Sequence, residues 1–364
     1  MTALAGALAE RIQRDGPLTL AAYMEACLND PEHGYYRTGA PIGAAGDFIT
    51  APEISQVFGE LLGLALAQAW IDQGQPAPFA LVELGPGRGR LMADALRAAR
   101  AAPGFLESAR LTLVETSGPL RAAQRRALES APLTPRWAAR IEEIEPAPLF
   151  LLANEFFDAL PIRQWRRAPG GWRERLIGLE AGRLAPVLSA APADRPADQA
   201  AILDAAPEGA WYERCEAGEA IAAEIGRRLA ASGGAALIID YGYDAAMRRS
   251  AGWRETFQAA RRHEFADPFA APGEADLTAH VDFSALSAAA EAAGAAAAPL
   301  ATQGAVLRAL GAEMRAAALA KAQPDAAETV MEGVTRLIDP REMGALFKVL
   351  GLTARGAPPL AGFG

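Results

Sequence analysis

The hydrophobic pattern of the chain alternates between short apolar runs and stretches of helical spacing, which is typical of an α/β protein. Four runs have the length of a strand: FALVEL from Phe79, RLTLVE ending at Glu115, LFLLANE from Leu149 and AALIIDYG from Ala235. Helical spacing follows the first two runs, over 91–102 and 119–128. Runs that are apolar on both faces and alternate with helices predict a parallel sheet covered by helices.

The regions outside these runs predict two helical ends and two irregular insertions. Apolar residues at helical spacing predict helices over 3–14 and 18–29, separated by Gly16-Pro17, with Thr19 as a candidate cap. A Gly/Pro-rich loop over 34–52 precedes another helix over 53–73. Further along we expect a hairpin around Gly170-Gly171, an irregular stretch over 243–281, helices over 305–335 and a last strand in LFKVLGL.

Composition narrows the class of protein. With 364 residues, 51% of them hydrophobic and 22% charged, the chain is a folded protein of about two domains. The net charge of −9 argues against sequence-independent binding to the phosphate backbone of nucleic acids. Cys27 and Cys215 fit neither a disulfide framework nor a paired-thiolate metal site. We find no apolar run long enough to span a membrane and no signal peptide after Met1, and we therefore expect a cytoplasmic protein.

The segment VELGPGRGR carries the clearest candidate chemistry. A buried strand ends in three glycines at alternate positions, Gly85, Gly87 and Gly89, where backbone without Cβ atoms can approach a ligand closely. Arg90 stands where the dinucleotide fingerprint needs its third glycine, and no Lys-Ser/Thr pair completes a phosphate loop. A glycine-rich turn with two solvated acids remains the alternative to a ligand site.

Two acidic residues suggest which ligand this loop holds. Glu83 lies two residues before the first glycine, and Glu115 closes the next strand. This is a pattern for S-adenosylmethionine, because Glu83 favours the cationic methionine end and Glu115 accepts hydrogen bonds from the ribose hydroxyls.

A second candidate motif follows the third apolar run. LLANEFFDALPI places Asn154 and Glu155 at a strand end and Asp158 three residues further. Ligands of open α/β sheets bind beyond the carboxyl ends of the strands, so this segment should face the same crevice as the glycine loop. Glu155 and Asp158 would cradle an arginine guanidinium, with Phe156 and Phe157 as pocket walls. The alternative is that the two rings are core and that Asp158 caps a turn.

The segment DLTAHVDF places polar side chains at alternating positions, namely Asp276, Thr278, His280 and Asp282. A metal site is imaginable here, but the other two histidines are distant in sequence, and we expect no metal. Asp282 is more simply the N-cap of the helix that follows, and His280 a structural residue or a substrate contact.

Several segments together resemble the MidA family of class I S-adenosylmethionine-dependent methyltransferases, whose mitochondrial members assist complex I assembly as protein arginine methyltransferases. The resemblance rests on an ordered set that spans nearly the whole chain: HGYY from His33, GDFITAPEISQVFGELLG from Gly46, VELGPGRGRL from Val82, LVETSGPLRAAQ from Leu113, NEFFDALPI from Asn154, IDYGY from Ile239, DLTAHVDF from Asp276, TQGAVLRALG from Thr302 and MGALFKVL from Met343. Such a set is far more specific than one glycine loop.

The resemblance implies a Rossmann-like methyltransferase sheet with an N-terminal helical segment and a largely helical or irregular inserted region. It also implies a cofactor partly covered by the GDFITAP loop. The residues assigned to S-adenosylmethionine are Gly46, Asp47, Thr50, Glu83, Gly85, Pro86, Gly87, Glu115 and Asn154, and those assigned to catalysis are Glu155, Asp158 and Asn154.

We expect the following organisation of the chain: N-terminal helices and a cofactor-covering loop (1–78), the first part of the core (79–165), a hairpin-containing insertion (166–217), core (218–242), an irregular insertion (243–282), core (283–302), a helical substrate-side region (303–340) and a C-terminal core strand and tail (341–364).

The family's activity implies symmetric dimethylation of an arginine on a core subunit of NADH:ubiquinone oxidoreductase. We expect a protein substrate of this kind, no nucleic acid or membrane partner, and a homodimer as one open possibility. Two alternatives stay open, methylation of a small molecule and a non-catalytic assembly factor that binds S-adenosylmethionine, since a fold does not fix the acceptor.

Overall fold

The structure is a computed structural model that describes residues 2–38, 50–192, 203–261 and 264–363. The chain divides into two compact units, each built from three separate segments. Unit 1 comprises Met1–Pro41, Asp158–Gly218 and Tyr243–Asp282, and unit 2 comprises Ile42–Phe157, Glu219–Gly242 and Phe283–Gly364.

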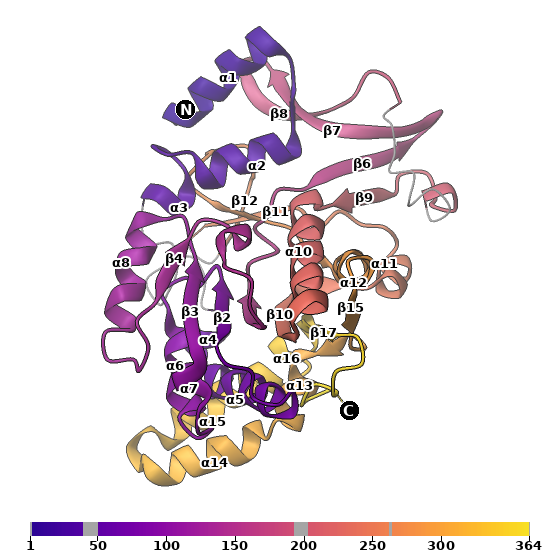
Figure 1. Cartoon of the computed structure of the whole chain (residues 1–364). Coiled ribbons are helices and arrows are strands. Elements are labelled where there is room, and N and C mark those ends of the chain that lie inside the picture. The colour runs from indigo at the N-terminus through magenta and orange to yellow at the C-terminus, as the bar shows by residue number, and fades with distance from the viewer. Residues whose placement is uncertain (1, 39–49, 193–202, 262–263, 364) are drawn as a thin grey trace. The chain divides into compact units, whose positions relative to one another are not determined.

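Unit 2 contains the large sheet. Its strands are β2 (Phe79–Leu84), β3 (Ala109–Val114), β4 (Arg136–Ala138), β5 (Leu149–Asn154), β10 (Gly234–Tyr243), β15 (Ala295–Ala297), β16 (Ala301–Thr302) and β17 (Phe347–Ala354). The order is β15-β17-β10-β5-β2-β3-β4, with β16 beside β17 (Figure 1). β4, β3, β2, β5 and β10 run parallel, whereas β17 lies antiparallel to β10 with Ile238 opposite Leu350. The sheet is therefore mixed, with a parallel centre.

The four predicted runs form the parallel centre of the sheet. Every residue of β2 and of β5 is buried, as parallel strands covered by helices require. Leu84 at the end of β2 pairs with Ala153 near the end of β5. The residues that follow these two strands consequently emerge side by side at one edge of the sheet.

The helices of unit 2 are α4 (Ala51–Ile54), α5 (Gln56–Asp72), α6 (Arg90–Ala99), α7 (Phe105–Ser108), α8 (Gly118–Ala127), α10 (Glu216–Ser232), α12 (Phe283–Ala292), α13 (Gln303–Ala309), α14 (Ala312–Ala322), α15 (Ala327–Ile338) and α16 (Met343–Leu346), with 3₁₀ turns η1 (Ile141–Glu143) and η3 (Pro324–Ala326). α5 and α6 pack closely, since a Cβ on Gly63 would lie 2.6 Å from the Cα of Ala95. An ion-pair network around the buried carboxylate of Glu60 joins three helices: Glu60 of α5 binds Arg97 of α6 at 3.0 Å and Arg315 of α14 at 2.7 Å.

Unit 1 contains the remaining elements: α1 (Ala3–Asp15), β1 (Leu18–Thr19), α2 (Leu20–Asn29), α3 (Tyr35–Thr38), β6 (Arg163–Ala168), β7 (Gly171–Glu180), β8 (Arg183–Leu188), β9 (Trp211–Arg214), α11 (Ala245–Ser250), β11 (Gln258–Arg261), β12 (Glu264–Ala266), β13 (Asp276–Thr278) and β14 (Val281–Asp282). β1, β7, β6 and β9 form an antiparallel sheet with β8 beside β7, and β12-β11-β13 form a smaller one. The predicted hairpin is confirmed, because Ala168 of β6 pairs with Gly171 of β7.

Local signals explain most element boundaries. Thr19 caps α2 as predicted, since its side chain accepts a hydrogen bond from the N–H of Ala22 at 3.1 Å. The single helix expected over 53–73 is interrupted, because Ser55 adopts an extended conformation and accepts from the N–H of Val57. Within the described ranges no helix is long and apolar enough to cross a membrane.

Candidate functional site

The glycine loop between β2 and α6 is shaped by left-handed backbone. Gly85 has φ of 59° and Gly87 has φ of 50°, values that side chains of L-residues rarely allow. A Cβ on Gly85 would also lie 2.6 Å from Cδ2 of Phe156, so the phenyl ring packs directly on this glycine. The loop thus brings the turn after β5 against the turn after β2; Phe156, expected as a pocket wall, packs on the glycine loop and is not among the residues that line the pocket at this edge of the sheet.

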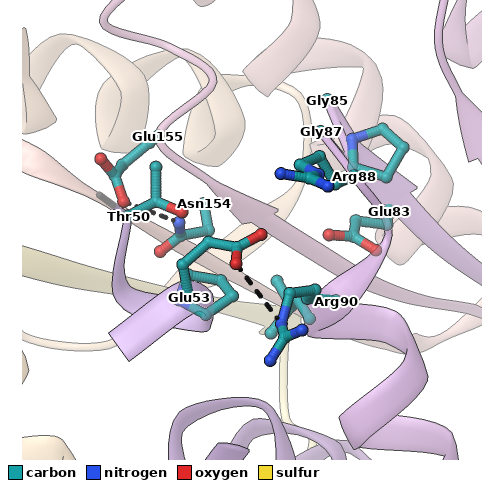
Figure 2. A pocket seen from close by; sticks show the side chains of 12 residues that line it. Thr50, Glu53, Glu83, Gly85, Gly87, Arg88, Arg90, Asn154 and Glu155 are labelled. Atoms are coloured by element: carbon teal, nitrogen blue, oxygen red, sulfur yellow. Dashed lines mark hydrogen bonds and ion pairs between the residues drawn. The ribbon is translucent and has the colours of Figure 1, made fainter. Parts of the chain in front are cut away.

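A pocket with an empty volume of about 410 Å³, including its part open to solvent, lies at this edge of the sheet within unit 2. Figure 2 shows Glu83 on the side of the glycine loop, with Asn154 and Glu155 across from it. The pocket is lined by Thr50, Pro52, Glu53, Glu83, Gly85, Pro86, Gly87, Arg88, Arg90, Leu91, Asn154 and Glu155. The structure therefore brings together six of the residues assigned to the cofactor from sequence, and Glu155.

Glu83 is the least compensated acid of the pocket. Its residue is 2% exposed, and its Oε2 atom has no hydrogen-bond partner among the described residues. Burial raises the pKa of its carboxyl to about 8, although a hydrogen bond from the backbone of Met92 favours the ionised form. A buried carboxylate oxygen without a partner is costly, and a cation in the pocket would compensate it.

Glu155 and Asn154 form a strained and hydrogen-bonded turn after β5. Glu155 has φ of 49°, in the left-handed region that is uncommon for a residue with a side chain. Its Oε1 accepts from Nδ2 of Asn154 at 3.1 Å and from the N–H of Ala51 at 3.3 Å. Its own N–H donates to the carbonyl of Ile239 at 2.9 Å. The Oδ1 atom of Asn154 is buried and has no partner within the described part of the chain.

The side chain of Asp240 also supports this turn. The buried carboxylate of Asp240 accepts from the N–H of Phe157 at 3.0 Å, and Phe157 is 3% exposed. Phe157 is thus a core residue, whereas Phe156 contacts the glycine loop. Tyr241, which follows Asp240, packs on Phe347 with ring centroids 5.6 Å apart and does not line the pocket.

Two arginine side chains line the pocket on the side of the glycine loop, across from Asn154 and Glu155. Arg90 forms an ion pair with Glu53 at 3.5 Å, drawn in Figure 2, and Arg88 lies beside the glycine loop. Carboxylates, a free amide oxygen and two guanidinium groups together suit a polar ligand that carries both an ammonium and a carboxylate. Glu53, Arg88 and Arg90 were not predicted from the sequence to line the pocket, although they lie in the segments TAPE and GRGR, which contain or adjoin predicted site residues.

Glu115 does not line this pocket but is connected to it. Its Oε1 accepts from the N–H of Ser117 at 2.7 Å, and its Oε2 accepts from Nε2 of Gln124 at 3.2 Å. The same Nε2 donates to the carbonyl of Gly87 at 2.8 Å. Burial raises the pKa of Glu115, while the donors from Ser117 and Gln124 lower it. Gln124 was not among the residues expected from the sequence.

The remaining expected residues lie elsewhere. Asp158 belongs to unit 1, where its carbonyl accepts from the N–H of Ala279 at 2.9 Å. Near it, the hydroxyl of Tyr36 donates to Asp276 at 2.9 Å. Burial raises the pKa of Tyr36, and the charges of Asp276 and Asp158 raise it further. Gly46 and Asp47 lie outside the described residues.

The polar residues of DLTAHVDF have separate partners rather than a common one. Thr278 accepts from the side chain of Gln258 at 3.3 Å, and Asp282 binds the guanidinium of Arg248 at 2.5 Å. Across the residues that the structure describes, no three His, Cys, Asp or Glu side chains are grouped to hold a metal.

Comparison with known proteins adds a family to this geometry. Residues 61–300 match the model of a family described as "Putative S-adenosyl-L-methionine-dependent methyltransferase". The chain is 34% identical to "Protein arginine methyltransferase NDUFAF7, mitochondrial" of Homo sapiens, over 94% of this chain and 81% of that protein. It is 35% identical to the protein of the same name from Danio rerio, over 98% of this chain and 91% of that protein.

Solved structures agree with this similarity. A protein of Burkholderia thailandensis in complex with S-adenosyl-homocysteine has a TM-score of 0.87 and 31% identity, over 99% of this chain and 94% of that chain. A native crystal structure from the same organism has a TM-score of 0.83 and 32% identity, over 99% and 93% of the two chains.

The relatives' names correct one expectation from the sequence. The curated relatives named above are mitochondrial proteins, so the predicted cytoplasmic location is contradicted and is withdrawn. Cysteine usage does not discriminate between the cytoplasm and an organelle.

Proposed function

Because the chain belongs to this family of S-adenosyl-L-methionine-dependent methyltransferases, we propose that its pocket binds S-adenosylmethionine for transfer of a methyl group to an arginine of a protein. The predicted fold, cofactor and reaction class are thereby confirmed. The arginine acceptor is supported by the relatives' printed name, protein arginine methyltransferase. We further propose that the acceptor protein is a subunit of NADH:ubiquinone oxidoreductase, as the family resemblance implies.

The observation that carries the proposed binding site is the unpartnered Oε2 of Glu83 beside the glycine loop. In the proposal, Glu83 binds the ammonium of the methionine part, and the backbone of Gly85, Pro86 and Gly87 lies along it. Thr50 and Asn154 border the ligand from the other side of the pocket. Glu115 holds the ribose. Gly46 and Asp47 stay predictions from the sequence, as does a homodimer.

When bound, S-adenosylmethionine supplies a methyl carbon activated by the adjacent sulfonium. An arginine nitrogen attacks this carbon, the carbon–sulfur bond breaks, and its electron pair stays on sulfur. The methylated guanidinium must then lose one proton. We propose that Glu155 orients the guanidinium and accepts that proton, because its carboxylate lies in the pocket and is fixed by Asn154 and Ala51. Asp158 stays a prediction from the sequence for the same task.

The test uses NADH:ubiquinone oxidoreductase isolated from cells that lack this protein, with methyl-labelled S-adenosylmethionine. The wild-type protein should label one subunit on arginine, which mass spectrometry locates. Glu155→Gln should lower the labelling rate by about 100-fold or more, while its affinity for S-adenosylhomocysteine changes by less than about threefold. Glu129→Gln, an exposed carboxylate on the turn after α8 that does not line the pocket, is the matched control and should retain full activity.

Four outcomes would contradict parts of the proposal. Label on lysine would refute the arginine acceptor, and label only in low-mass species of a lysate would refute the protein acceptor. A Glu155→Gln variant with the wild-type rate would refute the role of Glu155. If that variant lost labelling but still restored assembly of the oxidoreductase in cells, methyl transfer would not be the function that assembly requires.

A further inference from the structure

Gln124 is an unusual residue for its position in α8. Its exposed fraction is 0%, and it lies on the same helix face as the buried residues Leu120 and Leu128. The residues next to it, Arg125 and Arg126, are exposed. A fully buried amide is destabilising unless all of its hydrogen bonds are formed, so its presence among apolar neighbours calls for a specific set of partners.

The partners of Gln124 come from three different elements. The indole N–H of Trp137, in β4, donates to Oε1 at 2.7 Å. Since an indole nitrogen only donates, this bond fixes the orientation of the amide. The two N–H groups of Nε2 then face the carbonyl of Gly87 at 2.8 Å and Oε2 of Glu115 at 3.2 Å. One amide therefore links the glycine loop to the carboxylate at the end of β3.

The carboxylate of Glu115 depends on this amide for its orientation. Of its two oxygens, Oε1 is held by the N–H of Ser117 and Oε2 by Gln124. The backbone carbonyl of Glu115 is anchored separately, by Nε of Arg121 at 2.8 Å. Loss of the Gln124 donor would leave the backbone in place but release the one side-chain amide that holds Oε2, while the backbone donors of Thr116 and Ser117 remain.

We propose that Gln124 is a positioning residue that holds the Glu115 carboxylate at a set distance from the Gly87 carbonyl, so that the ribose and the methionine part of one ligand are bound together. The inference rests on the proposed function, which assigns Glu115 to the ribose and Gly87 to the methionine part. Gln124 itself does not line the pocket. A carboxylate that accepts from ribose hydroxyls must present its oxygens in a fixed direction, and Gln124 supplies that constraint.

Calorimetry with two ligands tests this role. The ligands are S-adenosylhomocysteine and its 2′,3′-dideoxy analogue, which lacks the hydroxyls that Glu115 would bind. The wild-type protein should prefer S-adenosylhomocysteine by about tenfold or more, the value of one charge-assisted hydrogen bond. Gln124→Met keeps the side-chain length and removes all three hydrogen bonds. It should weaken S-adenosylhomocysteine by about tenfold and reduce the preference to nearly one.

Two further variants separate positioning from packing. Trp137→Phe leaves Gln124 in place but removes the N–H that orients its amide, and it should show a smaller loss with the same direction of change in preference. Trp137→Phe also tests the positioning role if Gln124→Met does not fold. Arg126→Met, an exposed residue on the same helix, should bind both ligands as the wild type does. A residue with a purely structural role would lower thermal stability and leave the preference between the two ligands unchanged.

The failures of the two proposals are distinguishable. A wild-type protein that does not bind S-adenosylhomocysteine refutes the proposed function. A wild-type protein that binds both ligands equally overturns the inference about Gln124, because there is then no ribose contact to position. Retention of the wild-type preference in both Gln124→Met and Trp137→Phe overturns it as well.

Discussion

Replacement of Glu83 by glutamine should change both the stability of the protein and the pH dependence of ligand binding. The pKa of this carboxyl is about 8 in the folded protein and 4.5 ordinarily, because burial disfavours the charge. Between these values the folded protein holds a proton that the unfolded chain releases. Stability is therefore highest below pH 4.5 and falls as pH rises toward 8, by about 5 kcal/mol in total.

Glu83→Gln removes this ionisation and should leave a protein without ligand that is more stable than the wild type above pH 8. We expect a gain of about 3 to 5 kcal/mol in the free energy of unfolding at pH 8.5, and little difference at pH 5. Chemical denaturation at the two pH values measures both quantities. If Glu83→Gln is no more stable than the wild type at either pH, burial does not disfavour the ionised form of the Glu83 carboxyl.

The same group should release a proton when a cation binds beside it. At pH 6.5 nearly every Glu83 carboxyl is protonated, since the pKa is about 8. The ammonium of S-adenosylhomocysteine would stabilise the ionised form, so binding should release close to one proton. Calorimetry in buffers of different ionisation enthalpy measures this number. The wild type and Glu129→Gln should release the proton, and Glu83→Gln should not.

Two results would refute this reasoning. Binding by the wild type without proton release would mean that the ammonium does not approach Glu83. Equal release by the wild type and by Glu83→Gln would assign the proton to another group, of which Glu115 is the first candidate because burial also raises its pKa.

Three further predictions concern the loop and the scaffold. Gly85→Ala would place a Cβ 2.6 Å from the Phe156 ring at a φ of 59°, so calorimetry should find no binding of S-adenosylhomocysteine. The control Gly118→Ala adds a Cβ with no neighbour within 4 Å and should bind the ligand as the wild type does. Equal binding by both variants would refute the steric argument. Glu60→Gln should lower the free energy of unfolding by about 1 kcal/mol, because the two arginines that share this buried carboxylate are themselves 47% and 40% exposed and become solvated when it is lost. Thr19→Ala should lower it by about 1 kcal/mol through loss of the α2 cap, and a change below about 0.3 kcal/mol in denaturant titration would contradict this.

Sequence reasoning located the parallel centre of the sheet because its evidence is local. Each of the four predicted strands is a mostly buried apolar run, and a run of this kind is visible without knowledge of its neighbours. The direction of β17 is not a local property, since its apolar run would suit either orientation. β4 has three residues and too little pattern to be recognised.

The candidate site was predictable to the extent that it follows strand ends. Glu83, Gly85 and Asn154 lie where strands deliver the chain to one edge of the sheet, and the pocket contains them all. Gln124 could not be found in this way, because its role depends on contacts with residues 9, 13 and 37 positions away. One signal was available: a polar amide at the helical spacing of Leu120 and Leu128, on a face that is otherwise apolar.

The chain crosses between the two units several times, and this has a consequence for how the protein is made. Neither unit is a contiguous stretch that a ribosome could finish before starting the other. Unit 1 needs β13, which pairs with β11 in its small sheet, and unit 2 needs β17, near the C-terminus. Both units must therefore wait, partly formed, until synthesis is nearly complete, and a truncation of the last few dozen residues would leave apolar surface for chaperones and proteases to recognise.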